Sequence, residues 1–171
     1  MKVLVFGNLA AGKSYLSQKI CEAIPDIEYL SADCFRKKIG DGTIEKEQLA
    51  KQEFLNSIKP DKFQLIESIG LGKTGISIVN ILSDTSEIKI IIILKTALEI
   101  CLQRMEARTW DVPFPASTKY AYHIAEVSNE LIATKTIQLL WAEVINCHFF
   151  EIEELNDDSI LETINLIRKQ K

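Results

Sequence analysis

The segment at residues 7–14, which reads Gly-Asn-Leu-Ala-Ala-Gly-Lys-Ser, limits the fold of this chain more than any other feature. Its two glycines, followed by Lys and Ser, let successive backbone N–H groups turn toward one point. The apolar run at residues 2–6 predicts a buried strand before it. The helical spacing of Leu16, Ile20 and Ala23 predicts a helix after it. A strand, this loop and a helix, in that order, form a phosphate-binding loop.

The loop predicts a site for a nucleoside triphosphate such as ATP. Lys13 is expected to reach the β- and γ-phosphates and to act in catalysis, and the Ser14 hydroxyl is expected to hold Mg²⁺. A glycine-rich turn without a ligand is the alternative. The predicted nucleotide-binding residues are Gly7, Asn8, Leu9, Ala10, Ala11, Gly12, Lys13, Ser14 and Tyr15.

Length and composition indicate one ordinary globular domain. The chain has 171 residues and a net charge of −4, which argues against non-specific nucleic-acid binding but leaves room for a local basic site. Its four cysteines form no C-x-x-C pair and are expected to be reduced, buried thiols. The apolar run at residues 90–94 is too short to span a bilayer, and we expect no signal peptide before the first strand. We therefore expect a cytoplasmic protein without a membrane partner.

Apolar runs that alternate with helical patterns predict an α/β fold. Such alternation implies parallel strands joined by right-handed crossovers, with helices on both faces of the sheet. Thr96 is expected to cap the helix after the fourth strand, and Asp157 or Asp158 the last helix. The predicted strands lie near residues 2–6, 28–32, 63–68, 88–94 and 147–152, and one long helix is expected at 118–145, with Val127 and Leu131 on its apolar stripe.

Ligands of open parallel sheets bind at the carboxyl ends of the strands, where this chain places several charged residues. Asp33 follows the second strand and is a candidate general base or metal-shell acid, because a hydroxyl acceptor needs a carboxylate to take its proton. Arg36 lies three residues later on the same helical face and could bind an anionic substrate. The alternatives are a helix cap for Asp33 and a surface ion pair for the two together.

Further candidates follow the third and fourth strands. Glu67 is expected to hold the water shell of Mg²⁺ together with Ser14. Lys73 lies in a glycine-rich segment and could face an anionic substrate. Arg104 and Arg108 lie one helical turn apart before the segment at 110–115, and could neutralise charge on the transferred phosphoryl group. A solvated helix end is the alternative for the two arginines.

The chain resembles the small P-loop kinases of the adenylate kinase-like superfamily, which includes nucleoside monophosphate, shikimate, gluconate and polynucleotide kinases. The resemblance rests on residues 7–14, Asp33-x-x-Arg36 and Arg104-x-x-x-Arg108. It implies a five-stranded parallel sheet in order 2-3-1-4-5 within a single domain, residues 1–171, with a short lid around 108–117. It also implies that Asp33 faces the acceptor hydroxyl or the metal, and that the two arginines open the lid.

Three functions remain open at this point. The first is an ATP-dependent phosphotransferase that moves the γ-phosphoryl group to a hydroxyl of a small molecule or nucleoside. The second is a polynucleotide 5′-hydroxyl kinase, with a basic mouth formed by Lys37, Lys38 and Lys73. The third is a nucleotide-binding regulatory ATPase without an acceptor. Residues 67–71 lack the arginine that adenylate kinases carry after the third strand, which counts against a nucleoside monophosphate acceptor.

Overall fold

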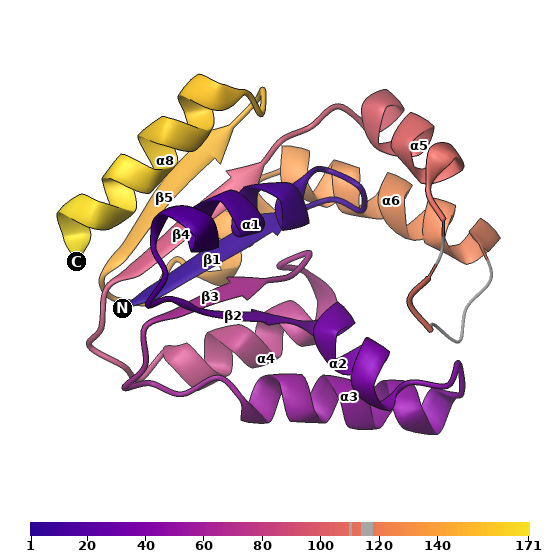
Figure 1. Cartoon of the computed structure of the whole chain (residues 1–171), viewed down its shortest axis with the longest axis horizontal. Helices are drawn as coiled ribbons and strands as arrows, with labels where there is room; N and C mark the ends of the chain where they lie inside the picture. Colours follow the sequence, from indigo (N-terminus) through magenta and orange to yellow (C-terminus); the bar gives the residue numbers. More distant parts are fainter. Residues whose placement is uncertain (110, 114–117) are drawn as a thin grey trace.

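The computed structural model describes residues 1–109, 111–113 and 118–171. Five strands form one parallel sheet in the order β2-β3-β1-β4-β5, which confirms the expected order (Figure 1). The strands are β1 (Lys2–Gly7), β2 (Glu28–Ser31), β3 (Gln64–Glu67), β4 (Lys89–Leu94) and β5 (Cys147–Ile152). The helices are α1 (Lys13–Ala23), α2 (Ala32–Ile39), α3 (Ile44–Asn56), α4 (Gly72–Leu82), α5 (Leu98–Ala107), α6 (Thr118–Ala133), α7 (Thr136–Leu140) and α8 (Asp157–Gln170).

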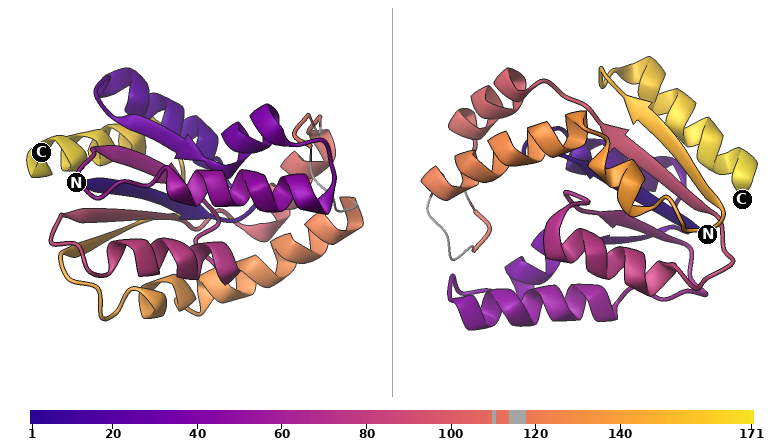
Figure 2. Two further views of the ribbon diagram at one scale, coloured as in Figure 1. Left: turned by 90° about the horizontal axis from the view of Figure 1, so that it is seen from below. Right: turned by 180° about the vertical axis from the view of Figure 1, so that it is seen from behind.

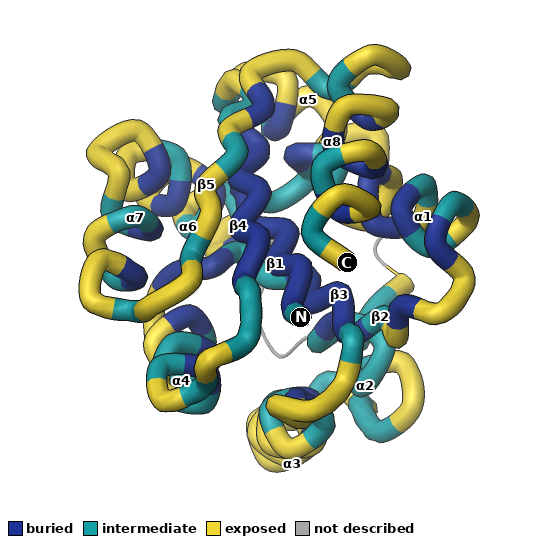
Figure 3. The backbone as a smooth tube through the Cα atoms, turned by 90° about the vertical axis from the view of Figure 1, so that its left-hand side faces the viewer, coloured by how far each residue is buried: buried dark blue, intermediate teal, exposed yellow. Residues whose placement is uncertain are grey.

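Alternate residues of the central strand β1 build the two cores. Val3 and Val5 face one cluster, which α1 and α8 cover, and Leu4 and Phe6 face the other, which α3, α4, α6 and α7 cover. Figure 2 shows the sheet between these two helical layers. Every residue of β1 and β4 is buried, whereas β5 lies at the sheet edge and is partly exposed (Figure 3).

The prediction of one helix at 118–145 is wrong. Helix α6 ends at Ala133, and Lys135 adopts a left-handed conformation with φ 57° before the short α7. Val127 and Leu131, expected on the apolar stripe, are exposed. The buried face of α6 instead carries mainly small side chains, because this helix packs closely against α5 and the phosphate-binding loop. Its buried residues include Ala121, Ala125, Ser128 and Ile132.

The helix caps differ from expectation at two of the helices. The N-cap of α5 is Ala97, and Thr96 instead donates a hydrogen bond to the Ala11 carbonyl at 2.9 Å. Helix α8 is capped by Asn156 in a reciprocal capping box with Ser159, so neither Asp157 nor Asp158 is the cap. Both aspartates lie in the first turn, where their charge favours the positive end of the helix dipole.

The cysteines are free thiols, but most of them are not buried as expected. All four cysteines are free, but only Cys101 is fully buried, while Cys21, Cys34 and Cys147 are partly exposed. Within the described residues, no helix combines the length and the apolar character needed to cross a bilayer.

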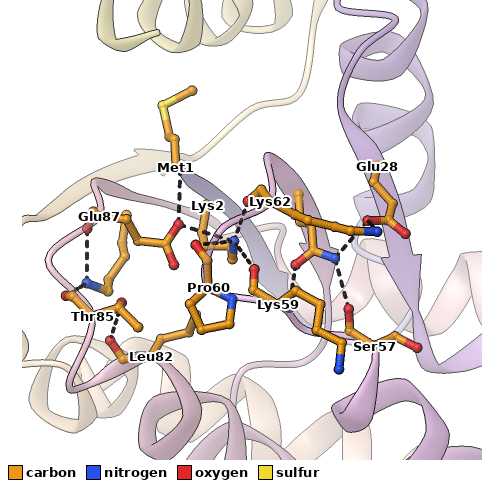
Figure 4. Close-up of polar contacts among 12 residues, drawn as sticks. Met1, Lys2, Glu28, Ser57, Lys59, Pro60, Lys62, Leu82, Thr85 and Glu87 are labelled. Atoms are coloured by element: carbon orange, nitrogen blue, oxygen red, sulfur yellow. Dashed lines mark hydrogen bonds and ion pairs between the residues drawn. The ribbon is translucent and has the colours of Figure 1, made fainter.

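Two lysines are completely buried at the amino ends of β1 and β4, where an apolar strand was expected. Lys2 and Lys89 are neighbours in the β1–β4 register. The Lys2 ammonium donates to the carbonyls of Lys59, Pro60 and Lys62 and pairs with Glu87 at 3.1 Å (Figure 4). The ammonium of Lys89 donates to the carbonyls of Thr85, Glu87 and Ile145. These two side chains therefore tie the loops at this end of the sheet to its two central strands.

Candidate active site

The phosphate-binding loop connects β1 to α1 and depends on glycine at position 12. Gly12 has φ 101°, a left-handed conformation that side-chain-bearing residues rarely adopt. A Cβ atom there would also lie 2.8 Å from the Leu155 side chain. Gly7 is constrained by space as well, because its Cβ would meet Leu94 at 3.0 Å. The two glycines of the motif are thus required by the path of the loop itself.

Neighbouring elements hold the loop in place. The Asn8 side chain is buried, and its amide donates to the Ala125 carbonyl of α6 at 2.9 Å. From the β4–α5 connection, Thr96 binds the Ala11 carbonyl. The loop is therefore fixed from both flanks before any ligand arrives, which lowers the cost of ordering it around a phosphate.

Lys13 begins α1 and turns back over the loop. Its ammonium donates to the Asn8 carbonyl at 2.6 Å. Burial lowers the pKa of Lys13, and the nearby carboxylates of Glu67 and Asp33 oppose that change. An incoming phosphate would add negative charge beside this ammonium and so favour its protonated form.

Glu67 ends β3 beside the first turn of α1. Its Oε1 accepts a hydrogen bond from the Ser14 hydroxyl at 2.8 Å, and its Oε2 accepts one from the Tyr29 hydroxyl at 2.5 Å. No group of three or more His, Cys, Asp or Glu residues able to hold a metal occurs within the described part of the chain. Mg²⁺ needs no such group, since it is typically held by one or two protein oxygens, phosphates and waters. The Ser14 and Glu67 oxygens therefore fit Mg²⁺ carried in by a nucleotide.

Asp33 and Arg36 form the first half of a chain of charges across α2 and α3. Ser31 is the N-cap of α2, so the cap role considered for Asp33 belongs to Ser31. The Asp33 carboxylate instead accepts from Arg36 Nη1 at 2.6 Å. Arg36 also donates from Nε and Nη2 to both oxygens of Glu47, at 2.8 and 2.6 Å. Lys51 completes the chain with a 2.9 Å ion pair to Glu47.

Glu47 and Lys51 were missed by sequence reasoning. Nothing in the spacing of residues 33–51 links them to Arg36; the packing of α2 against α3 brings them together. Burial alone would raise the pKa of Glu47, but hydrogen bonds from Arg36 and Lys51 lower it below its ordinary value. Glu47 is therefore ionised, and its hydrogen bonds fix the position of the Arg36 guanidinium, which in turn fixes the Asp33 carboxylate.

One cavity of about 360 Å³ joins the phosphate-binding loop to this chain of charges. Lys73 is exposed on α4 and does not line the cavity, although its neighbour Thr74 does. Neither Gly7 nor Asn8 lines the cavity, and the Asn8 amide instead holds the loop to α6. The predicted site residues that line it are Leu9, Ala10, Ala11, Gly12, Lys13, Ser14, Tyr15, Asp33, Arg36, Glu67 and Arg108.

The two arginines at the end of α5 occupy different places. Arg108 lines the cavity, whereas Arg104 donates from Nη1 to the Ala10 carbonyl at 3.2 Å, on the outer side of the loop. Of these two arginines, only Arg108 lines the cavity, whereas Arg104 contacts the backbone of the phosphate-binding loop.

The expected lid around 108–117 is described only in part, since Trp110 and residues 114–117 lie outside the described residues. The described part approaches α2 (Figure 1). Asp111 forms a 2.8 Å ion pair with Lys37. The ammonium of Lys38 lies 5.7 Å from the centre of the Phe35 ring. Two of the three lysines of the expected basic mouth, Lys37 and Lys38, therefore have partners within the protein.

Comparisons with known proteins identify the fold. No model of a protein family matches the sequence, and no curated protein matches it either. Three similar solved structures are shikimate kinase from Acinetobacter baumannii in complex with shikimate, a gluconokinase from Sinorhizobium meliloti 1021, and deoxyadenosine kinase from M. mycoides with bound dATP. Their TM-scores are 0.62, 0.60 and 0.58, and their identities 18%, 12% and 17%.

Each alignment spans nearly both proteins. It covers 99% of this chain in all three cases, and 94%, 93% and 100% of the respective structures. The chain thus shares its overall α/β fold with these three solved structures.

Proposed function

We propose that this chain is an ATP-dependent phosphotransferase that moves the γ-phosphoryl group to a hydroxyl of a small molecule or nucleoside. One observation carries the proposal: the phosphate-binding loop and the Asp33–Arg36 pair line the same cavity of about 360 Å³. The loop binds the phosphates, and Asp33 is the base on the acceptor side. The neighbours named above include kinases of small metabolites and of a nucleoside, which fits a cavity of this size.

Lys13 and the backbone amides of the loop bind the β- and γ-phosphates and orient the γ-phosphorus toward the acceptor. The oxygen of the acceptor hydroxyl forms a bond to the γ-phosphorus, and Asp33 accepts the proton that this hydroxyl loses. The bond between that phosphorus and the β–γ bridging oxygen breaks, and ADP leaves. Arg108 faces the transferred group and offsets its negative charge.

Ser14 and Glu67 would hold Mg²⁺ at the phosphates, where the ion neutralises charge that develops on the oxygens of the nucleotide. Arg36 would contribute by fixing Asp33, to which it donates at 2.6 Å, and by facing the acceptor across the cavity. Lys73 has no role in this proposal because it does not line the cavity.

A coupled assay of ADP release tests the proposal. The protein is incubated with ATP and Mg²⁺ and with a panel of sugars, hydroxy acids, nucleosides and 5′-hydroxyl oligonucleotides. We expect ADP release that depends on one class of small acceptor and disappears in Lys13→Met. Stimulation by oligonucleotides alone would instead support the polynucleotide kinase. Tight ATP binding with slow hydrolysis that no acceptor accelerates would support the regulatory ATPase and contradict the proposal.

A further inference from the structure

Tyr29 donates a hydrogen bond to the Glu67 carboxylate but has no place in the proposed function. It lies in β2, and its hydroxyl donates to Glu67 Oε2 at 2.5 Å. Glu67 Oε1 accepts from Ser14 at 2.8 Å. The two oxygens of one carboxylate are thus held from two different elements, a strand on one side and the first turn of α1 on the other.

The strand register explains how Tyr29 reaches this position. In the parallel β2–β3 pair, Tyr29 is opposite Leu65 and Ser31 is opposite Glu67. Residues two apart along a strand share a face, so Tyr29 and Glu67 project to the same side of the sheet, the side that α1 covers. The Tyr29 side chain is long enough to reach from its place opposite Leu65 to Glu67, two residues further along β3. Its ring packs against the apolar cluster beneath α1. Packing therefore fixes the ring and directs its hydroxyl.

A tyrosine hydroxyl, with an ordinary pKa of about 10, keeps its proton at neutral pH. Tyr29 is therefore a hydrogen-bond donor to Glu67 under these conditions.

We propose that Tyr29 is a positioning residue for the metal site: its hydroxyl fixes the Glu67 carboxylate so that Oε1 stays beside Ser14. This inference rests on the proposed function, because it assigns Ser14 and Glu67 to Mg²⁺ of the bound nucleotide. Groups that orient metal-ligating carboxylates typically contribute a factor of about ten or more to metal affinity. A purely structural tyrosine would contribute to stability and leave metal affinity unchanged.

Tyr29→Phe tests the inference, because it removes one oxygen atom and keeps the packed ring. Binding of Mn²⁺ in the presence of ADP is followed by the electron paramagnetic resonance signal of free Mn²⁺. We expect the variant to bind Mn²⁺ about tenfold more weakly, while its affinity for ADP in EDTA stays that of the wild type. Tyr122→Phe is the matched control, since Tyr122 packs between α5 and α6 and its hydroxyl does not contact Glu67.

A double-mutant cycle shows whether Tyr29 acts through Glu67. In a Glu67→Gln background, adding Tyr29→Phe should weaken Mn²⁺ binding by less than twofold, because the group that Tyr29 positions has lost its charge. Equal losses in both backgrounds would overturn the inference, as would wild-type Mn²⁺ affinity in Tyr29→Phe. If the wild type bound ADP but no Mn²⁺, the inference and the assignment of Ser14 and Glu67 to the metal would fall, while nucleotide binding at the loop would stand. If it bound no nucleotide at all, the proposed function would fall with it.

Discussion

The two ends of the parallel sheet both carry charged side chains, yet they use them differently. At the amino ends, Lys2 and Lys89 are fully buried, and each ammonium donates to three backbone carbonyls, those of Lys2 being shown in Figure 4. At the carboxyl ends, Lys13, Asp33 and Glu67 line a cavity of about 360 Å³. The lysines at the amino end bind carbonyls of the protein's own loops, whereas the charged residues at the carboxyl end line a cavity that a ligand can enter.

This comparison shows that burial of a charge does not by itself mark a functional site. Burial lowers the pKa of Lys2 and also that of Lys13. What separates the two lysines is the surroundings of the ammonium: carbonyls of residues 59–62 and Glu87 enclose one, and a cavity faces the other. Lysines at the amino end should therefore affect stability, and charged residues at the carboxyl end should affect turnover.

The largest effect is expected at the carboxyl end, for Lys13→Met. Loss of the ammonium removes the charge that holds the β- and γ-phosphates, so we expect kcat/KM to fall by about 10³-fold. The coupled assay of ADP release measures it. Lys19→Met is the control, since Lys19 lies on the same helix and pairs with Glu22 at the surface. Comparable activity of the two variants would contradict the assignment of Lys13.

Asp33→Asn is expected to lower kcat by about 10²-fold, the contribution of a general base. The amide has nearly the same shape and can still accept a hydrogen bond from Arg36, so KM for ATP and the melting temperature should change little. Steady-state kinetics and thermal unfolding measure the two properties. The exposed residue Asp84 supplies the control, Asp84→Asn. A raised KM for ATP with unchanged kcat would assign Asp33 to nucleotide binding instead.

Lys2→Met tests the opposite end of the sheet. The variant leaves the carbonyls of Lys59, Pro60 and Lys62 without this donor and removes one of the two cations that pair with Glu87, so the free energy of unfolding should fall by about 3 kcal/mol. Urea denaturation measures that loss, and Lys46→Met, at an exposed position of α3, should stay within about 0.5 kcal/mol of the wild type. Turnover per folded molecule should be unchanged. Reduced turnover at temperatures where Lys2→Met is fully folded would break the distinction between the two ends.

The smallest effect concerns Glu47 and depends on pH. The pKa of Glu47 is lowered in the folded protein, so the unfolded chain binds this proton more readily. The stability contributed by ionised Glu47 is therefore present above its unfolded pKa of about 4.3 and is lost as pH falls through the lower folded value. Glu47→Gln should cost about 2 kcal/mol at pH 7 and progressively less below about pH 4. Urea denaturation across this pH range measures the loss of unfolding free energy, with Glu45→Gln at an exposed position as the control. A loss that does not depend on pH would contradict the ionised state of Glu47.

Much of the fold could be predicted because its signals are local. The motif at residues 7–14 and the continuous apolar run of β4 each specify an element within a short stretch of chain. The break after Ala133 was not predictable in this way. The buried face of α6 carries alanines that fit against the loop, while the larger Val127 and Leu131 are exposed. A prediction that places the largest apolar side chains on the buried face therefore chose the wrong face of this helix.

By itself, the sequence determined the phosphate-binding loop, the alternation of strands and helices, and the placement of Asp33, Arg36 and Glu67 after the strands, because each depends on residue type and spacing over a few positions. Only the tertiary structure decided which charges share the cavity. Glu47 joins Arg36 through the packing of α2 on α3, and Tyr29 joins Glu67 through the register of β2 and β3. Contacts between distant segments depend on the packing of whole elements, which local sequence patterns do not encode.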